Sequence, residues 1–218
     1  NKKSTLIPTG FRALDNLIDG GFGKGELVVL GGRPGMGKTT LMLCIVRNIL
    51  ERSAFPVYYM CSDDEAATML KRLHALMSGI STQDLDEVAI ESTWNRYIDT
   101  LGMIEKFPLY LDDTHPAYIE RIMDACRWMK TENKIRLICI GNLQSIRTER
   151  SFRTRDLELG YICRKLKELA RELNTPLLAE SHLSRQVENR GGTKRPILAD
   201  LRDSGNIELE ADKVLFLY

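Results

Sequence analysis

The sequence predicts an α/β fold in which a mostly parallel central sheet is covered by helices on both faces. Short apolar runs alternate along the chain with segments whose apolar residues repeat at helical spacing. Apolar strands that alternate with helices are typical of parallel sheets buried on both sides. With 218 residues, 43% of them hydrophobic, the chain is long enough for one large domain. We therefore expect residues 1–218 to form a single domain.

The first half of the chain sets up this alternation. Residues 11–18 carry apolar residues at helical spacing and precede two glycines, which predicts a first helix that ends there. The apolar run at 27–30 lies between glycines and predicts a buried strand. Residues 39–52 are apolar around most of a helical circumference, as expected for a buried helix. A strand is expected at 57–61, followed by a helix at 64–78.

The second half continues in the same way. Apolar runs at 109–111 and 135–140 predict two strands, and residues 119–130 predict a helix between them. Residues 156–173 carry leucine and isoleucine along one stripe, which predicts a long amphipathic helix. The remaining expected strands are residues 177–180 and 214–218.

The charge balance excludes a strongly charged protein. Lys plus Arg is 31 and Asp plus Glu is 30, so the net charge is +1 and no strong overall field is expected. A nucleic-acid partner is neither required nor excluded, because a small basic patch on a neutral protein can bind a phosphate backbone. Basic residues concentrate between Arg147 and Arg155, and again between Arg185 and Arg202.

The five cysteines are predicted to be buried free thiols. They are odd in number, widely spaced and form no C-x-x-C pair, which indicates a reducing compartment. No apolar run is long enough to span a bilayer, and the N-terminus does not resemble a signal peptide. We therefore expect a cytoplasmic protein with no membrane partner. The chain stops inside the apolar run at 214–218, so we expect a fragment of a longer protein.

Residues 32–39 read G-R-P-G-M-G-K-T and match the phosphate-binding P-loop, G-x-x-x-x-G-K-[ST], without a gap. The motif lies between an expected strand and an expected helix, where backbone N–H groups and the helix N-terminus attract phosphate. Lys38 is expected to reach the β- and γ-phosphates, and Thr39 to offer its hydroxyl to Mg²⁺. The expected nucleotide contacts are Gly32, Arg33, Pro34, Gly35, Met36, Gly37, Lys38, Thr39 and Thr40.

Hydrolysis also requires carboxylates that hold Mg²⁺ and orient the attacking water, and two segments offer them. The apolar run at 109–111 ends in Asp112 and Asp113, and the run at 57–61 is followed by S-D-D-E at residues 62–65. The serine and glutamate of this second segment also match a capping box that opens the next helix, and the two roles are compatible. The strand expected at 135–140 ends in Gly141 and Asn142, without a carboxylate.

Several segments resemble one family of motor proteins. The most specific are E-L-N-T-P at 172–176, S-H-L-S-R at 181–185, K-R-P at 194–196 and D-L-R-D-S-G at 200–205. Together with the P-loop, and in the same order along nearly the whole chain, they resemble the RecA-like motor domain of DnaB-type replicative helicases. RadA- and KaiC-like ATPases share the front half of this pattern but not its last part.

The resemblance implies a site for ATP and Mg²⁺ with altered acids. Asp63 matches the family's catalytic glutamate and is one methylene shorter, and His182 matches the glutamine that senses the γ-phosphate. Arg72 matches a residue on the nucleotide side of the site, although a solvated helix arginine is an equal alternative. Gly141 falls where the family has its Mg²⁺-linked aspartate. The two aspartates at 112–113 match a different family strand and are not expected to replace that acid.

The resemblance also implies a binding site for single-stranded DNA. The loop at 200–205 would place Arg202 on a phosphate, with Asp203 beside it and the backbone N–H of Gly205 close to the strand. Since no aromatic residue accompanies the loop, we expect electrostatic and salt-dependent contact. The arginine-rich segment 147–155 either faces the same channel or is a solvated loop. A homo-hexamer is implied for the full-length protein, with a primase and a helicase loader as candidate partners.

We therefore expect the motor domain of an ATP-dependent replicative helicase, which couples ATP binding and hydrolysis to movement on single-stranded DNA. Two alternatives stay open. A nucleotide-binding, weakly hydrolysing DnaB-like subunit with a regulatory or structural role is favoured by Asp63, Gly141 and His182. A RadA- or KaiC-like ATPase that does not unwind DNA is the other.

Overall fold

The strands lie where the sequence predicts them. The structure is a computed structural model that describes residues 6–85, 91–184, 186–190, 193–201 and 205–218. Three strands run two residues beyond their expected ends, because pairing continues into glycine and polar residues that an apolar pattern does not include. The strands are β1 Leu27–Gly32, β2 Val57–Met60, β3 Leu109–Asp112, β4 Leu137–Asn142, β5 Leu177–His182 and β6 Lys213–Leu217.

Within the described part of the chain the strands form a six-stranded sheet in the order β3-β2-β4-β5-β1-β6. Each neighbouring pair is parallel. The expected mostly parallel α/β fold is therefore confirmed. The carboxyl ends of β1, β4 and β5 come together at one edge, and β1 leads into the P-loop. This strand order places segments that are far apart in sequence around the P-loop.

The helices follow the predicted alternation, with additions. One addition, α4, was not predicted, and two short helices lie near the C-terminal end. The helices are α1 Arg12–Leu17, α2 Lys38–Ser53, α3 Ala66–Ser78, α4 Glu91–Ile104, α5 Ile119–Glu132, α6 Arg155–Glu172, α7 Gln186–Asn189 and α8 Gly205–Glu210. Two 3₁₀ turns are also present. Leu143–Ser145 directly follows β4, and Leu198–Asp200 lies between α7 and α8 in the chain.

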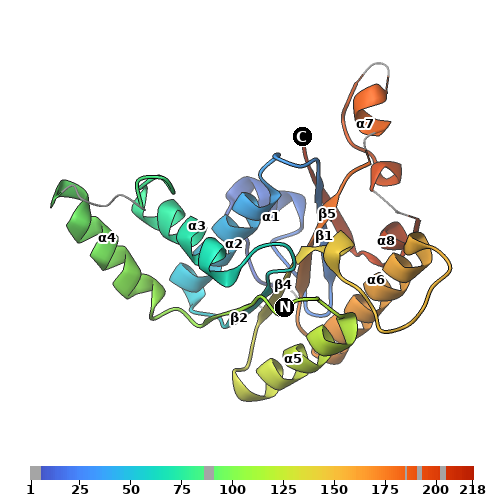
Figure 1. The fold of residues 1–218 in the computed structure, drawn as a ribbon, viewed down its shortest axis with the longest axis horizontal. Helices are drawn as coiled ribbons and strands as arrows, with labels where there is room; N and C mark the ends of the chain where they lie inside the picture. Colours follow the sequence, from blue (N-terminus) through green and yellow to red (C-terminus); the bar gives the residue numbers. More distant parts are fainter. Residues whose placement is uncertain (1–5, 86–90, 185, 191–192, 202–204) are drawn as a thin grey trace.

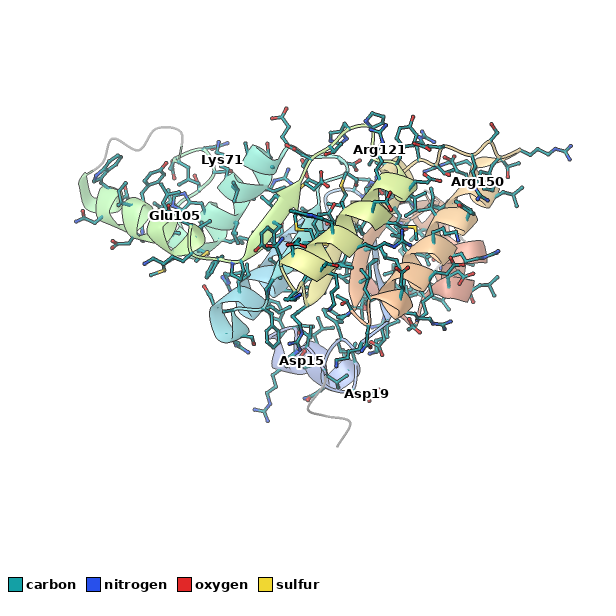
Figure 2. All side chains as sticks on the ribbon, turned by 90° about the horizontal axis from the view of Figure 1, so that it is seen from below. Asp15, Asp19, Lys71, Glu105, Arg121 and Arg150 are labelled. Carbon is teal, nitrogen blue, oxygen red and sulfur yellow. The ribbon has the colours of Figure 1, made fainter. Side chains whose placement is uncertain are left out.

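Helices cover both faces of the sheet (Figure 1). Alternate residues of β1 point to opposite sides: Leu27 and Val29 belong to the core under α5 and α6, whereas Val28 and Leu30 belong to the core under α2. Helices α5 and α6 pack side by side on the first of these faces, as Figure 2 shows. Helix α4 packs on α3 at one end of the molecule, away from the sheet centre (Figure 1).

The capping box expected at residues 62–65 is wrong. Helix α3 begins at Ala66, and the side chain of its N-cap residue Glu65 makes no capping hydrogen bond. Instead the N–H of Ala66 donates to Oδ2 of Asp113 over 2.9 Å, and the hydroxyl of Ser62 donates to the carbonyl of Asn142 over 3.1 Å. The end of β3 therefore caps this helix, a tertiary contact that a local sequence pattern does not contain.

The cysteines are free, as expected. Four are buried and Cys44 is half-buried, and burial raises the pKa of the Cys61 thiol to about 12. The four buried thiols therefore stay protonated and act as small apolar side chains. None of the described helices combines the length and the apolar character needed to cross a membrane.

Candidate nucleotide site

A cleft of about 460 Å³ opens beside the first turn of α2, at the carboxyl ends of the strands. In open parallel sheets this edge is where ligands bind. The P-loop forms one wall of the cleft through Pro34, Gly35, Gly37, Lys38, Thr39 and Thr40. The structure therefore places six of the nine predicted P-loop contacts around one cavity.

Two glycines give the P-loop its shape. Gly35 and Gly37 have φ angles of +79° and +83°, in the left-handed region that favours glycine. Gly37 is also the N-cap residue of α2, so the turn leads directly into the helix N-terminus. A loop of this kind directs backbone N–H groups toward a phosphate.

Lys38 is buried within the P-loop to which it belongs. Its side chain is only 6% exposed, and Nζ donates to the carbonyls of Gly32 and Arg33 over 3.0 and 3.2 Å. Burial lowers the pKa of this lysine, and the nearby charge of Glu180 acts in the opposite direction. The ammonium thus lies at the floor of the cleft, within the loop that is expected to bind phosphate.

Three predicted contacts lie outside the cleft lining as the structure describes it. Gly32 and Arg33 contribute carbonyls to Lys38, while the Arg33 side chain forms an ion pair of 2.7 Å with Glu188. Met36 is 48% exposed at the tip of the loop.

The residues matched to the family's site converge on the same cleft. Asp63, Arg72, Gly141 and His182 all line it, although they come from four separate segments. Arg72 forms an ion pair of 2.8 Å with Asp64, a neighbouring residue of the same wall. This position favours the nucleotide-side role of Arg72 over the alternative of a simply solvated helix arginine.

A glutamine fixes the end of β5 at this wall. The Gln144 side chain donates to the hydroxyl of Ser181 over 3.0 Å and accepts from the N–H of His182 over 3.1 Å. Gln144 lies in the 3₁₀ turn that follows β4. The residue that matches the γ-phosphate sensor is therefore held to the neighbouring strand end.

One acid in the cleft was not predicted from the sequence. Glu180 lies on β5 and is only 4% exposed. The Thr39 hydroxyl donates to its Oε2 over 3.0 Å, and the Tyr59 hydroxyl to its Oε1 over 3.5 Å. Burial raises the pKa of Glu180 to about 7, against the opposing effects of Thr39 and Lys38. A signal was present in the sequence: Glu180 is a lone acid inside an apolar strand. Because a buried carboxylate needs a partner, such an acid indicates a polar or charged group beside it.

The two aspartates that end β3 have other partners. Asp112 accepts from the hydroxyl of Tyr58 over 2.5 Å, and Asp113 caps α3. Neither lines the cleft as described. This agrees with the expectation that they do not supply the missing acid.

The residues expected to bind DNA are only partly placed. Arg202 and Asp203 lie outside the described residues, and Gly205 begins α8, which packs on α6. In the arginine-rich segment, Arg155 donates to two backbone carbonyls and pairs with Glu158, which indicates a structural role. Arg150 lies over the Tyr161 ring, near one end of the molecule (Figure 2).

The donors in the cleft fit Mg²⁺. The described residues contain no cluster of three or more His, Cys, Asp or Glu side chains suited to a metal ion. Magnesium does not need such a cluster, because it is usually bound through one or two protein oxygens together with nucleotide phosphates and water. The hydroxyl of Thr39 and the carboxylate of Glu180 are oxygen donors of this kind, side by side on the cleft wall.

The comparisons with known proteins decide the family. A family model described as the DnaB-like helicase C terminal domain matches residues 7–218. The chain belongs to this family. It is 36% identical over its whole length to the replicative DNA helicase DnaC of Bacillus subtilis (strain 168), of which it covers 48%. It is 37% identical over 98% of its length to the replicative DNA helicase DnaB of Helicobacter pylori (strain ATCC 700392 / 26695), of which it covers 44%. The chain thus spans about half the length of these relatives.

Solved structures support the same assignment for the DnaB-like domain. One solved ATPase domain superimposes with a TM-score of 0.91 at 30% identity, over 100% of this chain and 78% of the other. A DnaB-like replicative helicase whose interactions with primase were described superimposes with a TM-score of 0.89 at 30% identity, over 97% of this chain and 51% of the other. The RecA-like fold expected from the resemblance is therefore confirmed.

Proposed function

We propose that this chain is the ATP-driven motor domain of a replicative DNA helicase, and that its cleft binds ATP with Mg²⁺. The observation that carries the proposal is the joining of a complete P-loop to a buried carboxylate, through the 3.0 Å contact between Thr39 and Glu180. A phosphate-binding loop beside an acid at the carboxyl edge of a parallel sheet is suited to phosphoryl transfer from a nucleotide.

The residues of the cleft have separate roles in nucleotide binding and hydrolysis. Backbone N–H groups of the P-loop and the ammonium of Lys38 hold the phosphates. Asp63 orients the attacking water from the exposed side of the cleft, and His182 contacts the γ-phosphate from the end of β5. Arg72 lies on the nucleotide side. Magnesium, bound with the nucleotide, supplies positive charge that offsets the charge of the transferring phosphoryl group.

For the whole protein we propose a homo-hexameric helicase in which residues 1–218 form one ATPase domain. Single-stranded DNA would contact the loop at 200–205, with Arg202, Asp203 and Gly205 along the phosphate backbone. Primase is a candidate partner because one structural neighbour was described with its primase interactions. A helicase loader and a cytoplasmic location complete the proposal.

The test is ATP turnover by the full-length protein with saturating single-stranded DNA. We expect DNA-stimulated turnover that is lost in Lys38→Ala and kept in Lys106→Ala, an exposed lysine outside the cleft. Loss of the stimulation in both variants, or its persistence in Lys38→Ala, would contradict the proposal.

A second candidate function is favoured by one observation. Gly141 leaves the family's acid position without a carboxylate, which is compatible with a subunit that binds nucleotide and hydrolyses it weakly. Tight nucleotide binding by the wild-type protein, with no turnover in the presence of DNA, would favour this regulatory or structural role.

A further inference from the structure

We propose that Glu180 takes over the role of the missing aspartate, and that it holds the Mg²⁺ of the bound nucleotide together with Thr39. This inference rests on the proposed function, because it requires that the cleft binds a nucleotide with its metal. It assigns to β5 a role that the family places at the end of β4. The position of Glu180 in the sheet, its contacts and the packing around Gly141 each support it.

The sheet brings Glu180 next to the P-loop. Strand β5 lies between β4 and β1, and Glu180 is level with Leu30 of β1 and with Asn142 of β4. Glu180 is therefore one strand closer to the P-loop strand than Gly141 is. A side chain here reaches the first turn of α2 directly, as its contact with Thr39 demonstrates.

The spacing of the two oxygens suits a shared magnesium ion. Oε2 of Glu180 and Oγ1 of Thr39 are 3.0 Å apart. Two oxygens bound to adjacent vertices of a magnesium octahedron, each 2.0–2.1 Å from the metal, are about 2.9 Å apart. The pair already has this spacing. When the metal binds, the hydroxyl proton of Thr39 turns away from the carboxylate, and both oxygens direct a lone pair to the cation.

The surroundings of Glu180 favour a cation. The side chain is almost fully buried, where an ionised carboxylate is unfavourable unless positive charge compensates it. Lys38 acts on it through its charge, but the ammonium of Lys38 is directed to the carbonyls of Gly32 and Arg33. Oε2 therefore has the hydroxyl of Thr39 as its neutral partner and faces a cleft that a metal–nucleotide complex can enter.

The family's acid position is closed by packing. Gly141 lies where the pairing of β4 with β5 shifts register, between Ile140 and Asn142. A Cβ at this position would come within 2.8 Å of Oγ and 3.1 Å of the backbone N of Ser62, so an aspartate would require Ser62 to move. A carboxylate is thus absent at Gly141, where a side chain does not fit. On the adjacent strand, the carboxylate of Glu180 reaches Thr39.

A structural role for Glu180 makes a different prediction. If the carboxylate served only to fill the core and accept the hydrogen bond of Thr39, Glu180→Gln would keep both contacts, and the nucleotide affinity would stay the same with and without metal. If it holds the metal, its replacement removes only the part of the affinity that Mg²⁺ adds. The affinity without metal then stays the same or rises, because a negative charge beside the phosphates has been removed.

The experiment measures binding of ADP to the full-length protein, with Mg²⁺ and with EDTA, for the wild type and Glu180→Gln. We expect Mg²⁺ to tighten binding by the wild type, and we expect Glu180→Gln to reduce this gain by about tenfold or more. The matched control is Asp112→Asn, a strand-end carboxylate outside the cleft, which should keep the full gain. An equal Mg²⁺ gain in the wild type and Glu180→Gln would overturn the inference while leaving the proposed function intact.

A second variant protects the test against misfolding. Glu180→Asp keeps the charge but withdraws the carboxylate by one methylene from Thr39, so we expect a smaller Mg²⁺ gain with unchanged affinity in EDTA. A full gain in this variant would overturn the inference. If the wild-type protein binds no ADP in either condition, the proposed function fails, and this inference fails with it.

Discussion

Tyr58 donates a hydrogen bond of 2.5 Å from its phenol to Oδ2 of Asp112, across the neighbouring strands β2 and β3. Tyr58 belongs to the core on the sheet face opposite α2. Burial opposes the charge of Asp112, but hydrogen bonds from Tyr58 and Thr114 outweigh it and lower the pKa of this carboxyl below 3.8. The acid that a simple search for a strand-end aspartate would select is therefore a structural partner of a buried phenol.

Asp112→Asn should reduce stability and leave the nucleotide site intact. Removing the charge weakens the hydrogen bond from a buried phenol, which should lower the free energy of unfolding by about 1–3 kcal/mol. Urea unfolding gives this difference, and ADP titration gives the affinity. Tyr58→Phe should cause a similar loss of stability. A large drop in ADP affinity in either variant would mean that this pair supports the cleft.

His74 should make the protein less stable in mild acid. The ring is buried against Tyr97, and its Nε2 lies 3.1 Å from the Tyr97 carbonyl. Burial lowers the pKa of His74 below 6.5, against the opposing effect of this hydrogen bond. The unfolded chain therefore takes up a proton more readily than the folded one, so stability falls as pH decreases below the unfolded pKa.

The measurement is the free energy of unfolding between about pH 5 and pH 7, where the His74 contribution is expected. His74→Gln should show a weaker decrease toward acid than the wild type. Equal slopes in the wild type and His74→Gln would show that other groups cause the acid sensitivity.

Lengthening Asp63 should speed up ATP hydrolysis. Asp63 is exposed on the cleft wall and is one methylene shorter than the glutamate it matches in the family. Asp63→Glu brings the carboxylate closer to the phosphates, so we expect kcat to rise on the order of tenfold with little change in KM. Asp63→Asn should lower kcat. Asp64→Glu changes an acid that pairs with Arg72, and it should not raise kcat.

The P-loop and its surroundings could be predicted because they depend on local pattern. The shape of the G-x-x-x-x-G-K-T loop depends on the left-handed backbone of Gly35 and Gly37, which belong to the motif itself. The strands around the loop could be predicted from the alternation of apolar runs. The role of Glu180 could not be predicted in this way. Its contact with Thr39 depends on β5 lying between β4 and β1, and strand order is set by packing of the whole sheet.

Helix α4 was missed for a different physical reason. Trp94, Tyr97, Ile98 and Leu101 do recur at helical spacing, so the signal was present. The helix packs on α3 and leaves Trp94, Ile98 and Leu101 at least 40% exposed, so its apolar residues do not form the continuous stripe of a core helix. A segment that contacts only one neighbouring helix gives a weaker pattern than one buried against a sheet.

Lys38→Met should separate nucleotide binding from folding. The ammonium is buried and its pKa is lowered chiefly by that burial, so an apolar side chain of similar length should leave the nucleotide-free protein at least as stable as the wild type. With ADP and Mg²⁺ at about 100 times Kd, the wild type should gain about 2.7 kcal/mol of stability. The variant should gain little at the same ligand concentration, because the phosphates lose their charged partner. Thermal unfolding with and without ligand measures both effects, and Lys106→Met should behave as the wild type does. A ligand-induced rise in Tm for Lys38→Met equal to that of the wild type would mean that the phosphates bind elsewhere.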